Sequence, residues 1–408
     1  MTELSVEQIR RFRLAAHHLD RVYANADIPA VVGACGMQNS PPGAWETALF
    51  NRVPGCSRAE MERLLYEEKV LLQAWSMRGA PVVFPVSESG AFLAALTAGE
   101  GEPWIYTQGI ALALEFLQMD FDTLLEQMVQ VLPQLDGRLI LSKTALDQTI
   151  AEWMLPLLPE EKRKLWNQPS MYGNPDQQTV GGAVVSFLLR PCAYLGLVVF
   201  GERNGISPTF TSYKTWVGRG LEADHQEGAK ELVRKYLHCY GPATPDLFVT
   251  WLGCSKKQGR RLWELAAQEI EPVSVLGKRA FILAADRDGF GSPGELSREV
   301  LLLGGHDPFL DQRDRIILQP DKSLHKQIWK LVSNPGAIVY RGEIIGVWTG
   351  KKSGNKGMEI KMTLWKECGQ DVRRELERLG AEYAAFRGIA CSSIMFQVIS
   401  KSDAQPHC

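Results

Sequence analysis

The sequence has few features of membrane-spanning or disulfide-stabilised proteins. Its longest apolar stretch, residues 183–200, is interrupted by Arg190 and Pro191, so it is too short to span a bilayer. The eight cysteines include no CxxC pair, which argues against a zinc ribbon and a disulfide framework. The first residues are polar and then arginine-rich, without the apolar core of a signal peptide. We therefore expect a cytoplasmic protein with reduced thiols, no membrane partner, and no metal or other cofactor.

A strong excess of one charge is also absent. The formal net charge is −2 over 408 residues, so any binding to nucleic acid has to come from local basic patches. Hydrophobic residues make up 45% and charged residues 23% of the chain, which is typical of globular proteins. The length predicts about two to four domains, and nothing in the sequence requires more than a monomer.

The stretch 235–283 carries the clearest structural pattern. Gly241 and Pro242 should end one helix, and Thr244 is a plausible N-cap for the next, with Pro245 at its first position. Ser255 can cap a third helix, over residues 255–267. Two short strand-like runs follow, at residues 270–275 and 279–283. Three helices followed by a hairpin are the order of a winged-helix unit.

The third helix of this stretch, the expected recognition helix, has a basic face. Its early turns carry Lys256, Lys257, Arg260 and Arg261. These side chains are suited to contacts with DNA phosphates, although a solvated basic face on an ordinary helix gives the same pattern.

Helices followed by a hairpin occur twice more along the chain, with strand-like runs at residues 70–74 and 80–84 and at residues 193–200 and 209–214. Near the C-terminus a helix is expected over residues 370–386. The sequence thus predicts an α+β protein with three tandem winged-helix units and a C-terminal β-rich α+β region. The first helix should cover residues 5–25, with Arg13 and its neighbouring arginines facing outward or towards a partner. The predicted domains are residues 1–110, which include a loop with Gln38, then 111–222, 223–290 and 291–408.

Several short motifs, in order along nearly the whole chain, resemble the winged-helix DNA glycosylase family of the AlkZ/YcaQ type. They are GMQ at 36–38, WSMRG at 75–79, YGPAT at 240–244, WLG at 251–253, DPFL at 307–310, RDR at 313–315 and GEIIGVW at 342–348. The resemblance implies tandem winged helices that cup double-stranded DNA. It also implies a monofunctional glycosylase, a hydrolase of DNA repair, that releases N-alkylated purines, in some members from interstrand crosslinks.

The resemblance places Gln38 and Ser40 at the catalytic positions. Family members have a Gln-apolar-Gln or Gln-apolar-Asp motif there, whereas this chain has Gln38-Asn39-Ser40. An N7-alkylated purine is a cationic leaving group, so the enzyme has to place a water and stabilise an oxocarbenium-like sugar. A carboxamide oxygen can do both. The structural alternative is that Gln38 only caps the turn at residues 35–36.

Other residues are weaker candidates for DNA contacts. Arg78 can contact DNA or pair with a core carboxylate, and a buried ion network is an alternative role for the arginines of the RDR motif. The full set of these candidates is Arg78, Arg313, Arg315, Lys351 and Lys352, with the two lysines in an expected turn. His306, Asp307 and Asp311 fit no standard spacing of metal ligands, which favours structural or capping roles.

Three functions are open from the sequence. The first is a DNA repair glycosylase that uses Gln38 to position water. The second, motivated by Ser40, is a catalytically silent winged-helix DNA-binding protein. The third is a ligand-binding transcription regulator, which should have a dimerisation helix. The sequence has no long heptad run to support such a helix.

Overall fold

The structure, a computed structural model, describes residues 1–172, 178–205, 207–354 and 357–399. The chain forms two compact units. Unit 1 consists of Met1–Met61, Arg234–Leu247 and the described residues from Gln268 onward, and unit 2 consists of Glu62–Val233 and Phe248–Ala267. Helices and small sheets occur in both units, which confirms the mixed helix-and-strand character of the prediction.

The first helix of unit 1 is shorter than the sequence predicted. Helix α1 (Val6–Ala16) begins at a capping box formed by Ser5 and Gln8. It ends before His18, whose φ of 56° is left-handed and cannot continue the helix. Arg13 is fully buried rather than facing outward, because Asp314 and the backbone carbonyls of residues 240–242 bind its guanidinium.

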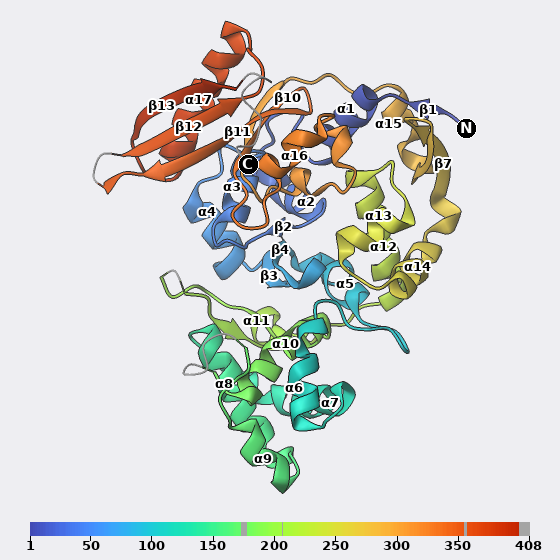
Figure 1. The fold of residues 1–408 in the computed structure, drawn as a ribbon, viewed down its shortest axis with the longest axis vertical. Helices are drawn as coiled ribbons and strands as arrows, with labels where there is room; N and C mark the ends of the chain where they lie inside the picture. Colours follow the sequence, from blue (N-terminus) through green and yellow to red (C-terminus); the bar gives the residue numbers. More distant parts are fainter. Residues whose placement is uncertain (173–177, 206, 355–356, 400–408) are drawn as a thin grey trace, which may run out of the picture. The chain divides into compact units, whose positions relative to one another are not determined.

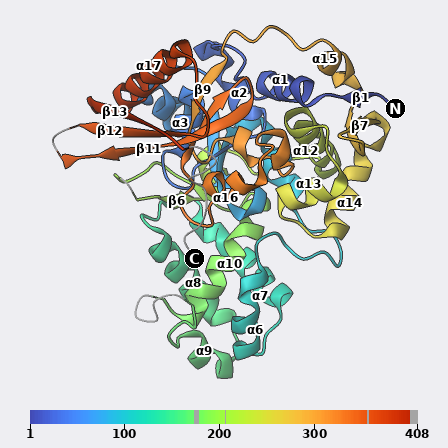
Figure 2. The ribbon, with the colours of Figure 1, turned by 45° about the horizontal axis from the view of Figure 1, so that its top comes forward.

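A five-stranded sheet forms the C-terminal part of unit 1, in the order β13-β12-β11-β10-β9. Helix α17 (Gln370–Phe386) lies along one face of this sheet and buries Leu376 and Leu379 against it (Figures 1 and 2). The predicted turn at Lys351 and Lys352 is wrong, since both residues pair with β12 in the ladder of a longer β11. The strands are β9 (Val300–Leu303), β10 (Gly336–Tyr340), β11 (Glu343–Lys352), β12 (Met358–Leu364) and β13 (Cys391–Val398).

A second sheet of unit 1 contains the hairpin predicted at the end of the stretch 235–283. Strands β7 (Ile270–Val275) and β8 (Lys278–Leu283) pair antiparallel, and β1 (Glu3–Leu4) adds in parallel to β7. The shorter elements of this unit are α2 (Ile28–Gly33), β2 (Met37–Gln38), α3 (Ala44–Phe50), α15 (Arg287–Gly291) and α16 (His325–Ile328).

Unit 2 packs helices around one apolar core. Its hairpin of β3 (Leu71–Trp75) and β4 (Pro81–Pro85) agrees with the prediction, and Trp75 packs against Phe200 and Phe210. The second predicted hairpin is much shorter than expected, because α10 continues to Tyr194 and the strands are only β5 (Val199–Phe200) and β6 (Phe210–Thr211). The main helices are α6 (Ala111–Leu117), α7 (Phe121–Val131), α8 (Lys143–Met154), α9 (Glu160–Trp166), α10 (Val180–Tyr194) and α11 (Tyr213–Val217).

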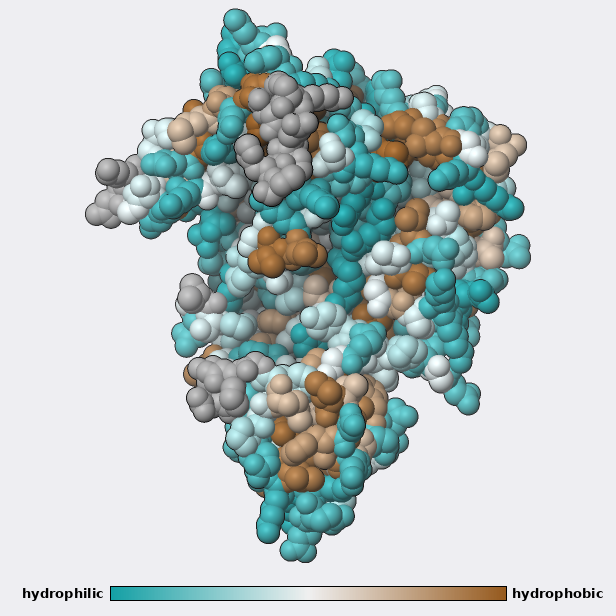
Figure 3. Space-filling view, viewed as in Figure 1, coloured by the Kyte–Doolittle hydropathy of each residue, from teal (hydrophilic) through white to brown (hydrophobic). Residues whose placement is uncertain are grey.

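The surface of unit 2 is partly apolar. Apolar side chains gather over α6 (Figure 3), where Leu112 and Phe116 are exposed. Among the described residues, no helix is both long and apolar enough to cross a membrane.

The helix ends that the sequence predicted in the stretch 225–265 agree with the structure, except that the third helix stops two residues before its predicted end at residue 267. The helices are α12 (His225–Tyr240), α13 (Pro245–Leu252) and α14 (Lys256–Leu265). Thr244 Oγ1 accepts from the Leu247 N–H at 3.3 Å, and Ser255 Oγ accepts from the Gln258 N–H at 3.1 Å. Both predicted N-caps are therefore confirmed. A shallow surface region on α14 is lined by its four basic residues and Glu264.

Candidate active site around Gln38

The loop after β2 is held by one buried side chain. Asn39 is 4% exposed, and its Oδ1 accepts a 2.8 Å hydrogen bond from the Gly43 N–H. Gly43 has a left-handed φ of 90° and precedes the first residue of α3, a conformation that glycine adopts without strain. Asn39 is thus part of the loop scaffold. On either side of it, Gln38 is partly exposed and Ser40 is exposed.

The Gln38 amide nitrogen has two hydrogen-bond acceptors. Nε2 donates to the backbone oxygen of Ser40 at 2.8 Å and lies 3.3 Å from Nδ1 of His306. These contacts, rather than the turn at residues 35–36, hold the Gln38 side chain. Within the described part of the chain, no residue donates a hydrogen bond to Gln38 Oε1. The carboxamide oxygen is thus available as an acceptor.

A cavity of about 660 Å³ adjoins these residues within unit 1. Its lining includes Gln38, Ser40, His306 and the loop 333–335. Arg387, which follows α17, adds a positive charge, with Nη1 3.6 Å from an ideal Cβ position on Gly43. Such a volume can hold a nucleobase-sized ligand, and its lining combines amide, imidazole and guanidinium groups.

The surroundings of His306 favour its neutral form. Burial lowers the pKa of its imidazole below the usual 6.5, and the nearby Asp311 carboxylate only partly opposes this shift. Neither His306 nor Arg387 was predicted as a functional residue. The DPFL motif at residues 307–310 directly follows His306 and marked this segment as part of the family pattern. No local sequence pattern indicated Arg387.

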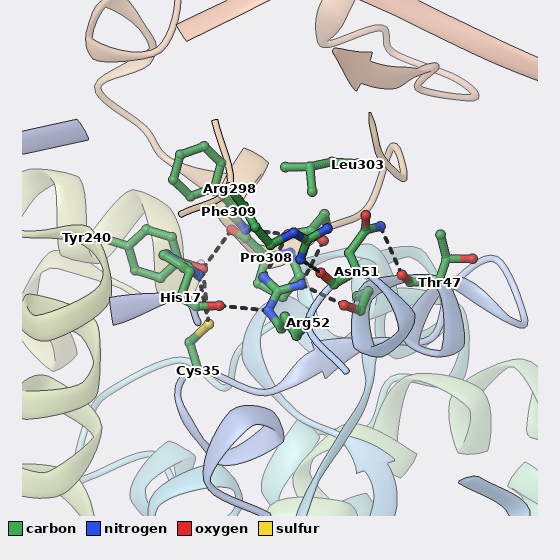
Figure 4. A network of polar contacts seen from close by, with 12 residues as sticks. His17, Cys35, Thr47, Asn51, Arg52, Tyr240, Arg298, Leu303, Pro308 and Phe309 are labelled. Carbon is green, nitrogen blue, oxygen red and sulfur yellow. Dashed lines mark hydrogen bonds and ion pairs between the residues drawn. The ribbon is translucent and has the colours of Figure 1, made fainter. Parts of the chain in front are cut away.

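The residue after His306 has the structural role that the sequence favoured. Asp307 accepts from the Phe309 N–H and so caps the short helix Pro308–Asp311. Its carboxylate also binds Arg52 through two hydrogen bonds of 2.8 and 2.9 Å, and both side chains are almost completely buried. Figure 4 shows this network, in which Arg52 also reaches the backbone oxygen of His17. The pair therefore fixes the segment that presents His306.

One buried cluster has the donor atoms of a metal site but is bonded within the fold. The donor atoms of His17, Cys35 and Cys239 lie within 4.8 Å of one another. His17 Nε2 contacts the Cys239 carbonyl at 3.1 Å, and the Cys239 thiol is 3.4 Å from the Ala34 carbonyl. These contacts account for the burial of the cluster as a hydrogen-bonded network.

The four basic residues of α14 differ in their contacts. Lys257 Nζ donates to the Glu100 carbonyl at 2.7 Å, and Arg261 makes a bidentate pair with the buried Glu102 carboxylate. Lys256 and Arg260 are exposed, and neither forms an ion pair or hydrogen bond through its side chain in the part of the chain that the structure describes.

The remaining DNA-contact candidates lie in three places. Arg78 Nη1 donates to the Trp251 carbonyl at the end of α13. Arg313 pairs with Asp311, and Arg315 stacks over the Trp329 ring at 4.7 Å. Asp314, between these two arginines, binds the buried Arg13 at 2.7 Å, so the motif takes part in ion pairing within the fold. Lys351 and Lys352 are exposed at the end of β11. None of these residues belongs to the lining of the Gln38 cavity.

Comparison with known proteins identifies the family. The family model described as "DNA glycosylase AlkZ-like" matches residues 31–386. The chain belongs to the AlkZ-like DNA glycosylase family. A curated relative, the "Interstrand DNA cross-link repair glycosylase" of Streptomyces sahachiroi, is 25% identical over 334 residues, which cover 78% of this chain and 81% of the relative.

A solved structure supports the fold. The Streptomyces sahachiroi DNA glycosylase AlkZ matches with a TM-score of 0.73 and 21% identity, covering 97% of this chain and all of that chain. In this AlkZ-like chain, Gln38 and Ser40 of the motif segment line the cavity, and Ser40 is exposed. The match of the family model over most of the chain confirms the expected family resemblance.

Proposed function

We propose that this protein hydrolyses the N-glycosidic bond of alkylated purines in double-stranded DNA, with Gln38 holding the attacking water. One observation carries the proposal: the Gln38 amide nitrogen is occupied by Ser40 and His306, which leaves Oε1 as an acceptor beside a base-sized cavity. A water held by this oxygen would lie against the positive charge that develops on the sugar, where an amide dipole is stabilising.

The leaving group explains why such modest groups suffice. A purine alkylated at N7 carries a positive charge and leaves without being protonated. Catalysis then depends on positioning the water and stabilising the oxocarbenium-like sugar, rather than on a strong general acid. The positive charge of Arg387 at the cavity suits a neighbouring DNA phosphate. Crosslinked purines are included in the proposal, because the Streptomyces sahachiroi relative is a cross-link repair glycosylase.

DNA binding in this proposal uses three tandem winged helices and a C-terminal β-rich region, with the boundaries 1–110, 111–222, 223–290 and 291–408. Helix α14 is the proposed recognition helix of the third unit, and Lys256 and Arg260 are its phosphate contacts. The protein acts as a monomer on duplex DNA.

A catalytically silent DNA-binding protein is the second candidate. Ser40 favours this candidate, because family members have Gln or Asp at this position. Ser40 contacts the Gln38 amide through its backbone oxygen and not through a side-chain acceptor. The two functions differ in the effect of Gln38→Ala on an oligonucleotide with one N7-alkylguanine. A glycosylase loses base release but keeps its DNA affinity, whereas a silent protein shows no release before or after the substitution.

A further inference from the structure

Gln38 lines the cavity, and its amide nitrogen contacts Ser40 and His306, so its oxygen remains as the acceptor. We propose that His306 is a positioning residue, which holds the Gln38 carboxamide in its water-binding orientation by accepting a hydrogen bond at Nδ1. This inference rests on the proposed function for its catalytic consequence. The hydrogen bond itself can be tested without any activity.

The two acceptors around Gln38 determine how its amide is oriented. The backbone oxygen of Ser40 can only accept, so the atom 2.8 Å from it has to be the amide nitrogen. The same nitrogen lies 3.3 Å from His306 Nδ1, which therefore has to present a lone pair. The imidazole proton of the neutral ring is then on Nε2.

Protonation of His306 would break this arrangement. A proton on Nδ1 places an N–H against the N–H groups of the Gln38 amide. If the amide rotates to accept from the imidazolium, its oxygen turns from the cavity and stands near the Ser40 carbonyl oxygen, where two acceptors repel. The neutral imidazole is thus the form that orients Gln38.

The surroundings of His306 favour the neutral form. Burial lowers its pKa, and Arg387 is a positive group at the same cavity. Asp311 is the acidic group that acts on it, and it is itself paired with Arg313. The other cavity-lining segments, at residues 40–44, 333–336 and 348–350, contribute no charged side chain.

The expected pH dependence follows from these charges. Base release should fall as the pH decreases through the lowered pKa of His306, with the uptake of one proton. A general acid would give the opposite sign, because its protonated form is the active one. The acid limb therefore separates a positioning role from proton donation to the leaving purine.

Two substitutions separate this role from a structural one. Asn carries an acceptor oxygen near the position of the imidazole Nδ1 but does not titrate, whereas Leu has no acceptor. We expect His306→Asn to retain single-turnover base release within about threefold and to lack the acid limb. His306→Leu should lower the rate at saturating DNA by about tenfold or more, with DNA affinity changed less than twofold, since one neutral hydrogen bond is lost. An unchanged rate in His306→Leu, or an acid limb that persists in His306→Asn, would overturn the proposal.

A spectroscopic measurement tests the hydrogen bond independently. In protein labelled with ¹⁵N-histidine, the ring shifts of His306 should show a proton on Nε2 and an unprotonated Nδ1, and Gln38→Ala should shift the Nδ1 resonance. A proton on Nδ1 at neutral pH, or no response to Gln38→Ala, contradicts the inference. If the spectra agree but the wild-type protein releases no base at any pH, the proposed function fails while the hydrogen bond stands.

Discussion

Replacing Asp307 by Asn should strongly destabilise unit 1. Asp307 is the only charge that binds the Arg52 guanidinium among the described residues, and the two side chains are 0% and 2% exposed. Asn keeps the shape and can still cap the Phe309 N–H, but it leaves a positive charge buried with only carbonyls such as those of His17 and Ala48. Breaking one side of a buried ion pair costs about 3–5 kcal/mol.

The measurement is the free energy of unfolding from urea titration, followed by circular dichroism, with hydrogen exchange of residues 44–52 as a local probe. A matched control is Asp371→Asn, which breaks the pair with Arg374 on the surface of α17, where the side chains are 91% and 75% exposed. Exposed pairs contribute at most about 1 kcal/mol, so the control should change stability little.

A compensated variant completes the test. Arg52→Met combined with Asp307→Leu removes both charges and should be less destabilising than Asp307→Asn, since no unpaired charge remains buried. Equal destabilisation by Asp307→Asn and Asp371→Asn would refute this expectation, because the buried ion pair would then contribute no more to the free energy of unfolding than the exposed pair.

The remaining predictions concern DNA binding and acid stability. Replacing Lys256 and Arg260 together by Ala should reduce the slope of log affinity against log salt by about 1–2, as each removes about one phosphate contact; an unchanged slope would contradict these contacts. Burial, with the charges of Arg52 and His17, lowers the pKa of His18 from 6.5 to about 4. The unfolded chain therefore binds a proton that the fold excludes, and stability is lost as the pH falls from about 6.5 to 4. In urea titrations at several pH values, His18→Asn should reduce this acid-induced loss of unfolding free energy by about 2 kcal/mol or less, because His18 is partly exposed.

The sequence predicted local structure best where a side chain acts on its own backbone. The caps at Thr244 and Ser255 depend on contacts three residues apart, so they could be recognised directly. The hairpin at residues 71–85 followed from its apolar runs and intervening turn. Helix α17 agreed with its predicted span, because its apolar positions recur at helical spacing.

The sequence could not predict where distant residues meet. Arg13 looked like a surface arginine, but its partner Asp314 is 301 residues away, and burial follows from that pairing. His306 lies 268 residues from Gln38, so no local spacing could reveal their contact. The family motifs indicated the Gln38 loop, whereas the imidazole beside it and Arg387 became candidates only from the folded arrangement.

The central claim is that Gln38 supplies the catalytic acceptor. Its most direct test is a single-turnover assay on a duplex with one N7-alkylguanine, where alkali cleaves the abasic product, compared between the wild-type protein and Gln38→Ala. We predict that the wild-type protein releases the base and that Gln38→Ala binds the duplex equally well but releases it at least a hundredfold more slowly. Equal rates of release by the two proteins would contradict a catalytic role for Gln38.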